Sequence, residues 1–184
     1  MKRITLIIFL LSINFSFSQK KELRKAQKLF DGGDIAAASQ LLTEFQSILE
    51  NADQKVKPQY QFLKGKIAQQ NKEFKIAYDL FNNIKENSSL KEEVTQQMLL
   101  LSADIVNSAI DDNNAGNFKA STEKLYMAYN IDPEANQDYL YFAASSAVNA
   151  DMFEAALSYY IKLKEIKYTG VVTKYYVTEV DSGN

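Results

Sequence analysis

The sequence predicts an all-α protein of about four antiparallel helical hairpins, with a short β-strand near its C-terminal end. Two observations predict the helical part. A ladder of small and large apolar residues recurs along the chain, and the offsets within each copy fit one face of a helix. The β-branched and aromatic composition of the last residues predicts the strand.

Each copy of the ladder is organised around an apolar anchor that follows a turn-like element. Small residues lie nine positions before and three positions after the anchor, and a large apolar residue lies seven after it. Offsets of three and seven lie on one helical face, so each anchor begins a helix, and the small residues let two helices approach closely. In chain order, the anchors are Ile35, Phe74, Phe118 and Phe153; the small residues before them are Ala26, Gly65, Ala109 and Ala144; those after them are Ala38, Ala77, Ser121 and Ala156; and the large residues are Leu42, Phe81, Leu125 and Tyr160.

One hairpin of this kind cannot bury both of its faces, so neighbouring hairpins must stack on it and form a solenoid. An ordinary helical bundle would carry similar apolar stripes. It would not carry matched small residues at both offsets in every copy, and the pattern therefore favours a repeat.

The ladder resembles the tetratricopeptide repeat family over roughly residues 20–168. The third copy ends in a turn at Pro133 like the family's terminal proline turn, although the anchors are 39, 44 and 35 residues apart and the chain has no tryptophan. The resemblance implies a right-handed superhelical solenoid with hairpins at about 20–50, 58–87, 89–131 and 135–167. The last copy matches best, at Leu140, Ala144, Ala147, Phe153, Ala156 and Tyr160.

Several polar residues and one glycine are placed to cap the predicted helices. Ser89 and Glu92 have the spacing of a capping box, which would begin a helix several turns longer than usual. We expect Gly170 to end the last helix as a C-cap. The expected N-caps of other helices are Asp34, Asp132 and Asp151.

The first 18 residues have the order of a cleaved signal peptide. A basic start at Lys2 and Arg3 precedes an apolar run over residues 4–15, and Ser16 and Ser18 place small residues before Gln19. The run is shorter than the roughly 20 residues that span a bilayer, and no cysteine follows it to carry a lipid. We therefore expect an exported protein, most simply periplasmic, with the cell surface and secretion as alternatives.

Residues 169–184 change in character. Residues 171–180 have a strand composition, and residues 181–184 read as the turn of a hairpin whose return strand does not follow. The pattern predicts that the protein continues beyond Asn184, and a frayed natural end is the alternative. The segment resembles larger exported tetratricopeptide proteins of Bacteroidetes-like bacteria.

The composition argues against several classes of function. Removal of Lys2 and Arg3 leaves 19 basic against 23 acidic residues, a net charge of −4, which disfavours nucleic acid as a partner. The chain has neither histidine nor cysteine, which removes the commonest general base, the thiolate nucleophile and the usual zinc ligands. Asp111 and Asp112 could be half of a glycosidase pair, but adjacent helix residues point in different directions. We predict no enzyme, metal, cofactor or transmembrane segment in the mature chain.

The resemblance implies that the first helix of each hairpin lines a concave groove. Amides and aromatic rings there would suit an extended peptide, whose backbone amides need hydrogen-bond partners. The lysine–asparagine pair with which the family's chaperone-type members hold a terminal carboxylate has no counterpart in this chain. The offsets predict groove positions at Gln59, Phe62, Lys66, Gln69, Val106, Ile110, Asn113, Tyr141, Ser145 and Asn149.

These features predict a scaffold that binds a protein or peptide in the cell envelope. A structural spacer that positions a downstream domain is the alternative, and an enzyme that relies on carboxylates alone is a third. The basic residues of the first helix are interpreted as a solvated face, with contact to anionic lipid headgroups or an acidic partner as the alternative. These residues are Lys20, Lys21, Arg24, Lys25 and Lys28.

Overall fold

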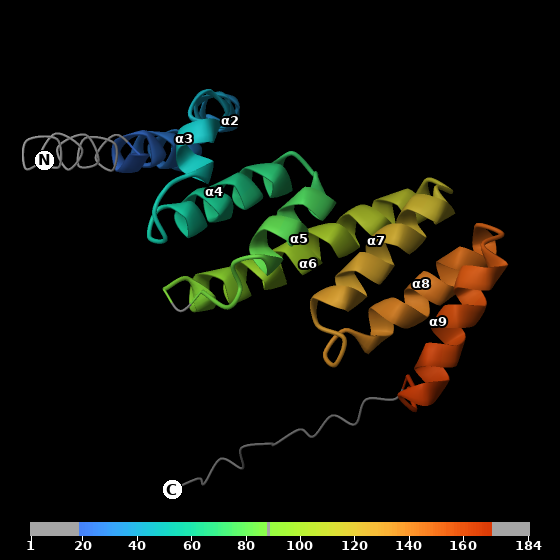
Figure 1. Ribbon diagram of the computed structural model, residues 1–184. Helices are drawn as coiled ribbons and strands as arrows, with labels where there is room; N and C mark the ends of the chain where they lie inside the picture. The colour runs from blue at the N-terminus through green and yellow to red at the C-terminus, as the bar shows by residue number, and fades with distance from the viewer. Residues whose placement is uncertain (1–18, 88, 171–184) are drawn as a thin grey trace, which may run out of the picture. The chain divides into compact units, whose positions relative to one another are not determined.

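The computed structural model describes residues 19–87 and 89–170, and every regular element within them is an α-helix (Figure 1). The predicted all-α class is confirmed. The predicted signal peptide and the predicted strand at 171–180 lie outside the described residues. An N-terminal helix covers residues 19–31, and the others are α2 (Ile35–Glu44), α3 (Gln46–Glu50), α4 (Lys57–Gln70), α5 (Phe74–Asn82), α6 (Lys91–Asn114), α7 (Phe118–Ile131), α8 (Gln137–Asn149) and α9 (Phe153–Glu165).

The helices belong to two compact units, Met1–Asn107 and Ser108–Asn184, and α6 contributes to both. We refer to the N-terminal helix, α4, α6 and α8 as leading helices, because each precedes an anchor. The predicted anchors begin the helices that follow them: α2, α5, α7 and α9 start at Ile35, Phe74, Phe118 and Phe153. This part of the prediction is confirmed to the residue.

Each leading helix ends in the same backbone turn. The residue two positions before the anchor is left-handed, and the next N–H donates to a carbonyl five positions earlier, which is the Schellman C-cap pattern. The closing bonds, from Asp34 to Leu29, Glu73 to Ala68, Asn117 to Asp112 and Met152 to Ala147, measure 2.8 to 2.9 Å. The left-handed residues are Gly33 (φ 84°), Lys72 (φ 61°), Gly116 (φ 78°) and Asp151 (φ 56°).

Two of these left-handed positions are occupied by residues with a side chain, which strains the backbone. We expect Lys72→Gly to raise the free energy of unfolding of the first unit by about 0.5–1 kcal/mol, because glycine adopts this conformation without steric cost. Urea denaturation followed by circular dichroism measures the change. Lys25→Gly is the matched control: Lys25 is exposed in the middle of the N-terminal helix, and its replacement should cost about 1 kcal/mol. Equal destabilisation by both changes would contradict the left-handed turn.

The predicted caps are correct in one case and wrong in others. Asp34 caps α2, since its Oδ1 accepts the Ala37 N–H at 3.0 Å. Asp151 is not an N-cap but the left-handed residue of the turn, so Met152 precedes α9 without a side-chain cap. The Gly170 C-cap is also wrong: α9 ends at Glu165, and Lys167 (φ 57°) makes the turn instead.

The two remaining cap predictions are displaced by a few residues. The Ser89 hydroxyl donates to Asn87 Oδ1 at 2.7 Å, and α6 begins two residues after Ser89. Asp132 Oδ1 accepts the N–H groups of Glu134 at 3.2 Å and Ala135 at 3.1 Å, so it caps the turn around Pro133 rather than α8. Short polar side chains can bond several nearby amides, which makes the position of a cap harder to predict than its presence.

The small residues of the ladder are all buried, as the close approach of paired helices requires. Gly65 shows why size matters: a Cβ atom added there would lie 2.5 Å from the Phe81 ring, which is fully buried. The second hairpin therefore brings α4 and α5 together through a glycine facing a phenylalanine. At no other glycine in the described part of the chain would an added Cβ atom lie so close to a side chain.

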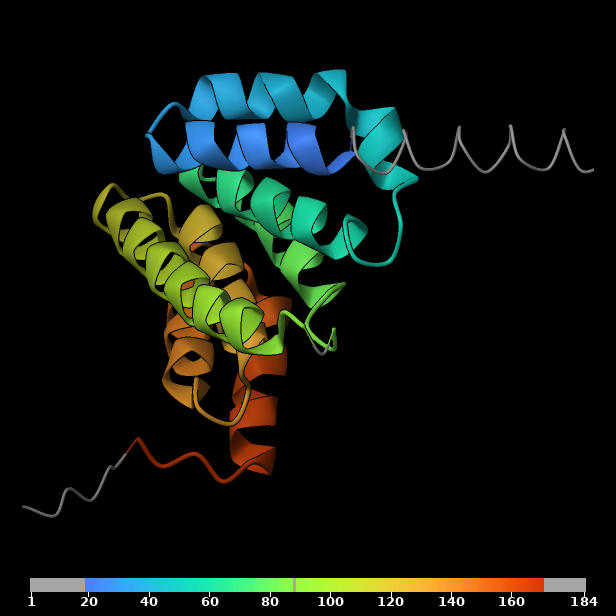
Figure 2. The same cartoon turned by 90° about the vertical axis from the view of Figure 1, so that its left-hand side faces the viewer.

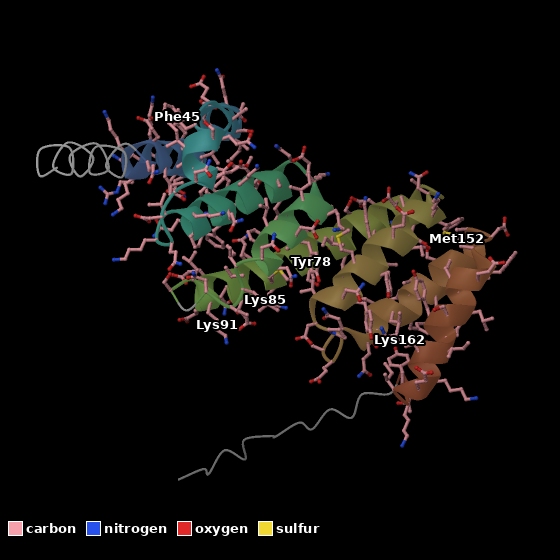
Figure 3. All side chains as sticks on the ribbon, in the orientation of Figure 1. Phe45, Tyr78, Lys85, Lys91, Met152 and Lys162 are labelled. Carbon is pink, nitrogen blue, oxygen red and sulfur yellow. The ribbon has the colours of Figure 1, made fainter. Side chains whose placement is uncertain are left out.

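The first unit is built around one apolar core. The N-terminal helix and α2 run antiparallel (Figure 2), and both contact α4 through this core. The helix predicted to continue to about residue 50 is broken at Phe45, whose backbone (φ −103°, ψ 13°) separates α2 from α3 (Figure 3). The break lets Leu49 of α3 be fully buried in the same core. Its other main members are Leu23, Ala26, Ala38, Leu42, Tyr60 and Leu63.

In the second unit, α8 packs between α7 and α9. Leu140 and Ala144 of α8 contact Tyr129 of α7 and Leu163 of α9, and the Lys162 ammonium lies 5.0 Å from the centre of the Tyr129 ring (Figure 3). The stripe predicted for α9 is only partly packed: Ala156 is buried, whereas Phe153 and Tyr160 are exposed. The exposed large apolar residues of this helix are Phe153, Leu157, Tyr160 and Ile161.

The exposure of α9 has a positional cause. Leu125, seven residues after the third anchor, is buried against Ala143 of the next leading helix, α8. Tyr160 holds the same place after the fourth anchor, and no further leading helix follows α9 within residues 153–170. The position seven residues after the anchor is therefore buried in one hairpin and exposed in the next.

Candidate functional site

A cleft of about 430 Å³ opens in the first unit on the side of the leading helices. The N-terminal helix contributes one wall, α4 contributes the other, and the segments before α4 and α6 also line the cleft. Buried Leu23 and Val56 fix the two walls on the core, since both belong to the main apolar cluster. The lining residues are Lys20, Leu23, Arg24, Gln27, Lys55, Val56, Gln59, Phe62 and Leu90.

Three predicted groove residues of the second hairpin lie in or beside this cleft. Gln59 is exposed and lines it, and Phe62 is half-buried there with its ring 5.6 Å from Phe81. The Lys66 ammonium lies 4.4 Å from the centre of the Phe30 ring and 5.8 Å from that of Phe62. The cation and the rings therefore brace the N-terminal helix against α4.

Gln69, the fourth predicted residue of this hairpin, has a different role. Its side chain is buried, its Nε2 donates to Asp104 Oδ2 at 2.7 Å, and its Oε1 accepts from Gln97 Nε2 at 2.7 Å. This amide chain joins α4 to α6. Because both ends of the Gln69 amide are engaged, we remove this residue from the set that could contact a peptide.

Basic side chains dominate the rim of the cleft. Lys20 and Arg24 are one helical turn apart on the N-terminal helix, and Lys55 faces them from the turn before α4. All five basic residues of this helix are exposed, as the interpretation of a solvated face requires, but Lys20 and Arg24 also line the cleft, whereas Lys21, Lys25 and Lys28 lie outside it. The groove offsets applied to Ala26 would have identified Lys20, Leu23 and Gln27.

Two carboxylates stand near the rim and are already hydrogen-bonded. Asp53 Oδ1 accepts the backbone N–H groups of Lys55 and Val56, each at 2.9 Å, and the bond from Lys55 is the main cause that lowers the pKa of the Asp53 carboxyl. Asp31 Oδ1 accepts from Gln27 Nε2 at 2.7 Å, which leaves the Gln27 carbonyl oxygen for other donors.

The predicted positions on the third hairpin lie along α6. Ile110 is 50% exposed, Asn113 is exposed and Val106 is half-buried. Val106 belongs to the first unit, whereas Ile110 and Asn113 belong to the second. Among the described residues of each unit, no hydrogen bond or ring contact of these side chains assigns them a role, and their place in a groove stays a prediction.

The predicted positions on the fourth hairpin lie along α8. Tyr141 is 43% exposed, Ser145 is half-buried and Asn149 is exposed. Asn149 lines a recess of about 490 Å³ at the turns before α7 and α9, together with Asn117, Lys119 and other residues. The recess is separate from the face that carries Tyr141, so the structure does not bring these three positions into one pocket of the second unit.

The segment after α9 folds back onto α8. The Tyr168 ring stacks on Tyr141, with 6.0 Å between the ring centres, and the Tyr168 hydroxyl donates to Asp138 Oδ1 at 2.5 Å. This hydrogen bond to a carboxylate is the main cause that raises the pKa of Tyr168 to about 12. The groove side of α8 is thus partly covered by the chain itself, whereas the cleft of the first unit is open.

Asp112 forms an ion pair with Lys124 of α7. Lys124 Nζ donates to Asp112 Oδ2 at 2.5 Å and to Ser108 Oγ at 2.7 Å, and the charged side chains are only 20% (Asp112) and 27% (Lys124) exposed. Asp111 is exposed. The pair joins α6 to α7 within the second unit, which gives Asp112 a structural role.

We expect Asp112→Asn to lower the free energy of unfolding of the second unit by about 1–2 kcal/mol, because it leaves the half-buried Lys124 ammonium without its counter-charge. Asp111→Asn is the matched control, and its effect should stay within about 0.5 kcal/mol. Urea denaturation of both variants measures the difference. Equal effects would show that the ion pair contributes nothing, and loss of a turnover with an intact fold would revive the enzyme hypothesis.

Comparison with known protein families, curated proteins and solved structures yields no match for this chain. Among residues 19–87 and 89–170, no helix combines the length and apolar character needed to cross a membrane. The candidate site is an open cleft with an apolar floor, two glutamines and a basic rim.

Proposed function

We propose that this protein is an exported tetratricopeptide-like scaffold that binds a protein or peptide partner through the leading helices of its hairpins. The observation that carries the proposal is the open cleft between the N-terminal helix and α4, which contains Gln59 and Phe62 at the predicted groove offsets. Amide groups beside an apolar floor suit an extended chain, which needs both backbone hydrogen bonds and pockets for side chains.

The repeated turn supports the tetratricopeptide-like part of the proposal. Four leading helices end in the same left-handed cap two residues before the anchor, and the small residues on both sides of it are buried. Hairpins of one geometry stack with a constant rotation and present their leading helices on one side, which makes a superhelical solenoid with a continuous binding surface. The apolar, basic-headed first 18 residues support export, and we place the protein in the periplasm or elsewhere in the cell envelope.

A structural spacer is the second candidate function. The contact of Tyr168 with Asp138 and Tyr141 favours it, because here the chain itself covers a leading-helix surface. In a spacer, a continuation of the chain would fill the rest of the groove, and the repeats would only position a downstream domain. The two functions differ in what occupies the leading-helix side of the first unit.

Photo-crosslinking in cells that express the full-length protein separates these functions. Photoreactive residues would replace Gln59 in the cleft and Tyr141 on α8, and the control would replace Ile76, which is 49% exposed on α5. We expect Gln59 to trap a defined envelope protein that Ile76 does not trap. Crosslinks from Gln59 to the protein's own downstream chain alone would contradict the scaffold and favour the spacer. Equal trapping from all three sites would contradict a specific groove.

A further inference from the structure

The cleft of the first unit combines an apolar floor with a rim of unpaired positive charge. Leu23, Val56 and Phe62 belong to the floor, and the basic rim residues are Lys20, Arg24 and Lys55. No carboxylate is among the residues that line the cleft. Within residues 19–87 and 89–170, the ion pairs are Lys75–Asp79, Lys91–Glu86 and Lys124–Asp112, so none of them involves the rim cations.

The cations are placed by the core and not by a general excess of basic residues. The buried side of the N-terminal helix is held by Leu23 and Ala26, which orients Lys20 and Arg24 toward the α4 wall. Lys55 is held across from them because the Asp53 carboxylate fixes its backbone N–H. Asp53 is charged at neutral pH and offsets part of the local potential of Lys20 and Lys55, whose charges help to lower the pKa of its carboxyl.

We infer that this cleft binds an acidic extended peptide that carries an apolar side chain between its carboxylates. Charge complementarity selects the acidic class, because a positive rim without lining carboxylates favours anions and repels basic segments. Arg24 can bind a carboxylate with two parallel hydrogen bonds, and the side chains of Gln27 and Gln59 offer partners for the peptide backbone. The floor takes the apolar side chain. This inference rests on the proposed function and names the chemistry of its partner.

An anionic membrane is a different partner for the same charges, and the geometry favours it less. A bilayer surface would contact the outward cations Lys21, Lys25 and Lys28, which are exposed on the same helix but do not line the cleft. The cleft cations instead surround a recess with a buried floor, which a flat headgroup layer does not enter. The two partners therefore depend on different lysines of one helix.

Fluorescence anisotropy with the purified full chain tests the inference. The probe is a fluorescein-labelled peptide of alternating glutamate and leucine, blocked at both ends, and its counterpart has lysine in place of glutamate. The cleft variant is Lys20→Glu with Arg24→Glu, and the matched control is Lys21→Glu with Lys25→Glu, which changes the same charge on the same helix. We expect the cleft variant to weaken binding of the acidic probe by about tenfold or more and the control by less than about threefold.

Other outcomes overturn the inference in distinguishable ways. Equal weakening by both variants, or equal binding of the lysine peptide, would show that the cleft selects no acidic segment. A lipid surface would be the partner if the protein sediments with phosphatidylglycerol vesicles, if only the control variant loses this sedimentation, and if the wild-type protein does not bind the acidic probe. If the wild-type protein does not bind the acidic probe but a photoreactive residue at position Gln59 still traps a partner in cells, the inferred acidic chemistry is wrong and the proposed function stands. If the probe does not bind and no partner is trapped, the inference and the proposed function are both wrong. Circular dichroism of each variant verifies that the helices remain folded.

Discussion

Gly65→Ala is expected to lower the free energy of unfolding of the first unit, although alanine is the better helix former. The added Cβ atom would lie 2.5 Å from Cε1 of Phe81 and 2.9 Å from its Cδ1. The Phe81 ring is fully buried and adjoins Phe62, so it cannot turn away without moving other core atoms. Overpacking of this kind costs about 1–3 kcal/mol, which exceeds the roughly 1 kcal/mol that alanine gains over glycine in a helix.

The sign of the effect should reverse when the opposing ring is removed. In a Phe81→Leu background the smaller side chain leaves room for the Cβ atom, so Gly65→Ala should stabilise that variant by up to about 1 kcal/mol. Urea denaturation of the four proteins of this double-mutant cycle measures the coupling. A Gly65→Ala effect of the same sign and size in both backgrounds would contradict the contact between α4 and α5 on which the second hairpin depends.

Leu140→Ala is expected to cost about 2–5 kcal/mol in the second unit, the largest single effect that we predict. Leu140 is 0% exposed and shares one cluster with Tyr129, Ala144 and Leu163, so its removal leaves a cavity where α7, α8 and α9 meet. Ala144 is already small and cannot fill the space. The cavity term adds to the lost transfer free energy because the three helices relax only partly.

Leu157→Ala is the matched control, with the same change in the same unit. Leu157 is 62% exposed on the outer side of α9, and its replacement should change stability by no more than about 0.5 kcal/mol. Thermal and urea unfolding, followed by tyrosine fluorescence and circular dichroism, compare the two variants. A large effect of Leu157→Ala would mean that another part of the protein or a partner covers the outer side of α9.

The positions of the following helices were predictable because they depend on local properties. An apolar stripe at helical spacing, a turn before it and small residues at fixed offsets identify a helix start without knowledge of distant residues. Ile35, Phe74, Phe118 and Phe153 all begin helices as predicted. Helix ends were less predictable, because Asp151 and Lys167 adopt left-handed conformations that glycine usually takes. For this reason the sequence pattern favoured Gly170, and not Lys167, as the C-cap of the last helix.

The candidate site was only partly predictable. Gln59 and Phe62 lie in the cleft, but Gln69 is engaged by Gln97 and Asp104 from a helix about 30 residues away, and no local pattern reports such a partner. The exposed apolar residues of α9 show the same limit. Phe153 and Tyr160 hold the places of Phe74 and Phe81, which are buried in the second hairpin, and whether a neighbour covers such a residue is not a local property.

The sequence by itself determined the helical class and the anchors at which helices begin, and it is the basis of the export that we propose. It also contained the five basic residues of the N-terminal helix, which periodicity alone describes as one charged surface. Only the tertiary structure separated them, because Lys20 and Arg24 join Lys55, Gln59 and Leu90 in one cleft when the helix docks on α4. The physical reason is that helix propensity and amphipathicity depend on neighbours three or four residues apart, whereas a recess and its electric potential depend on segments that only packing brings together.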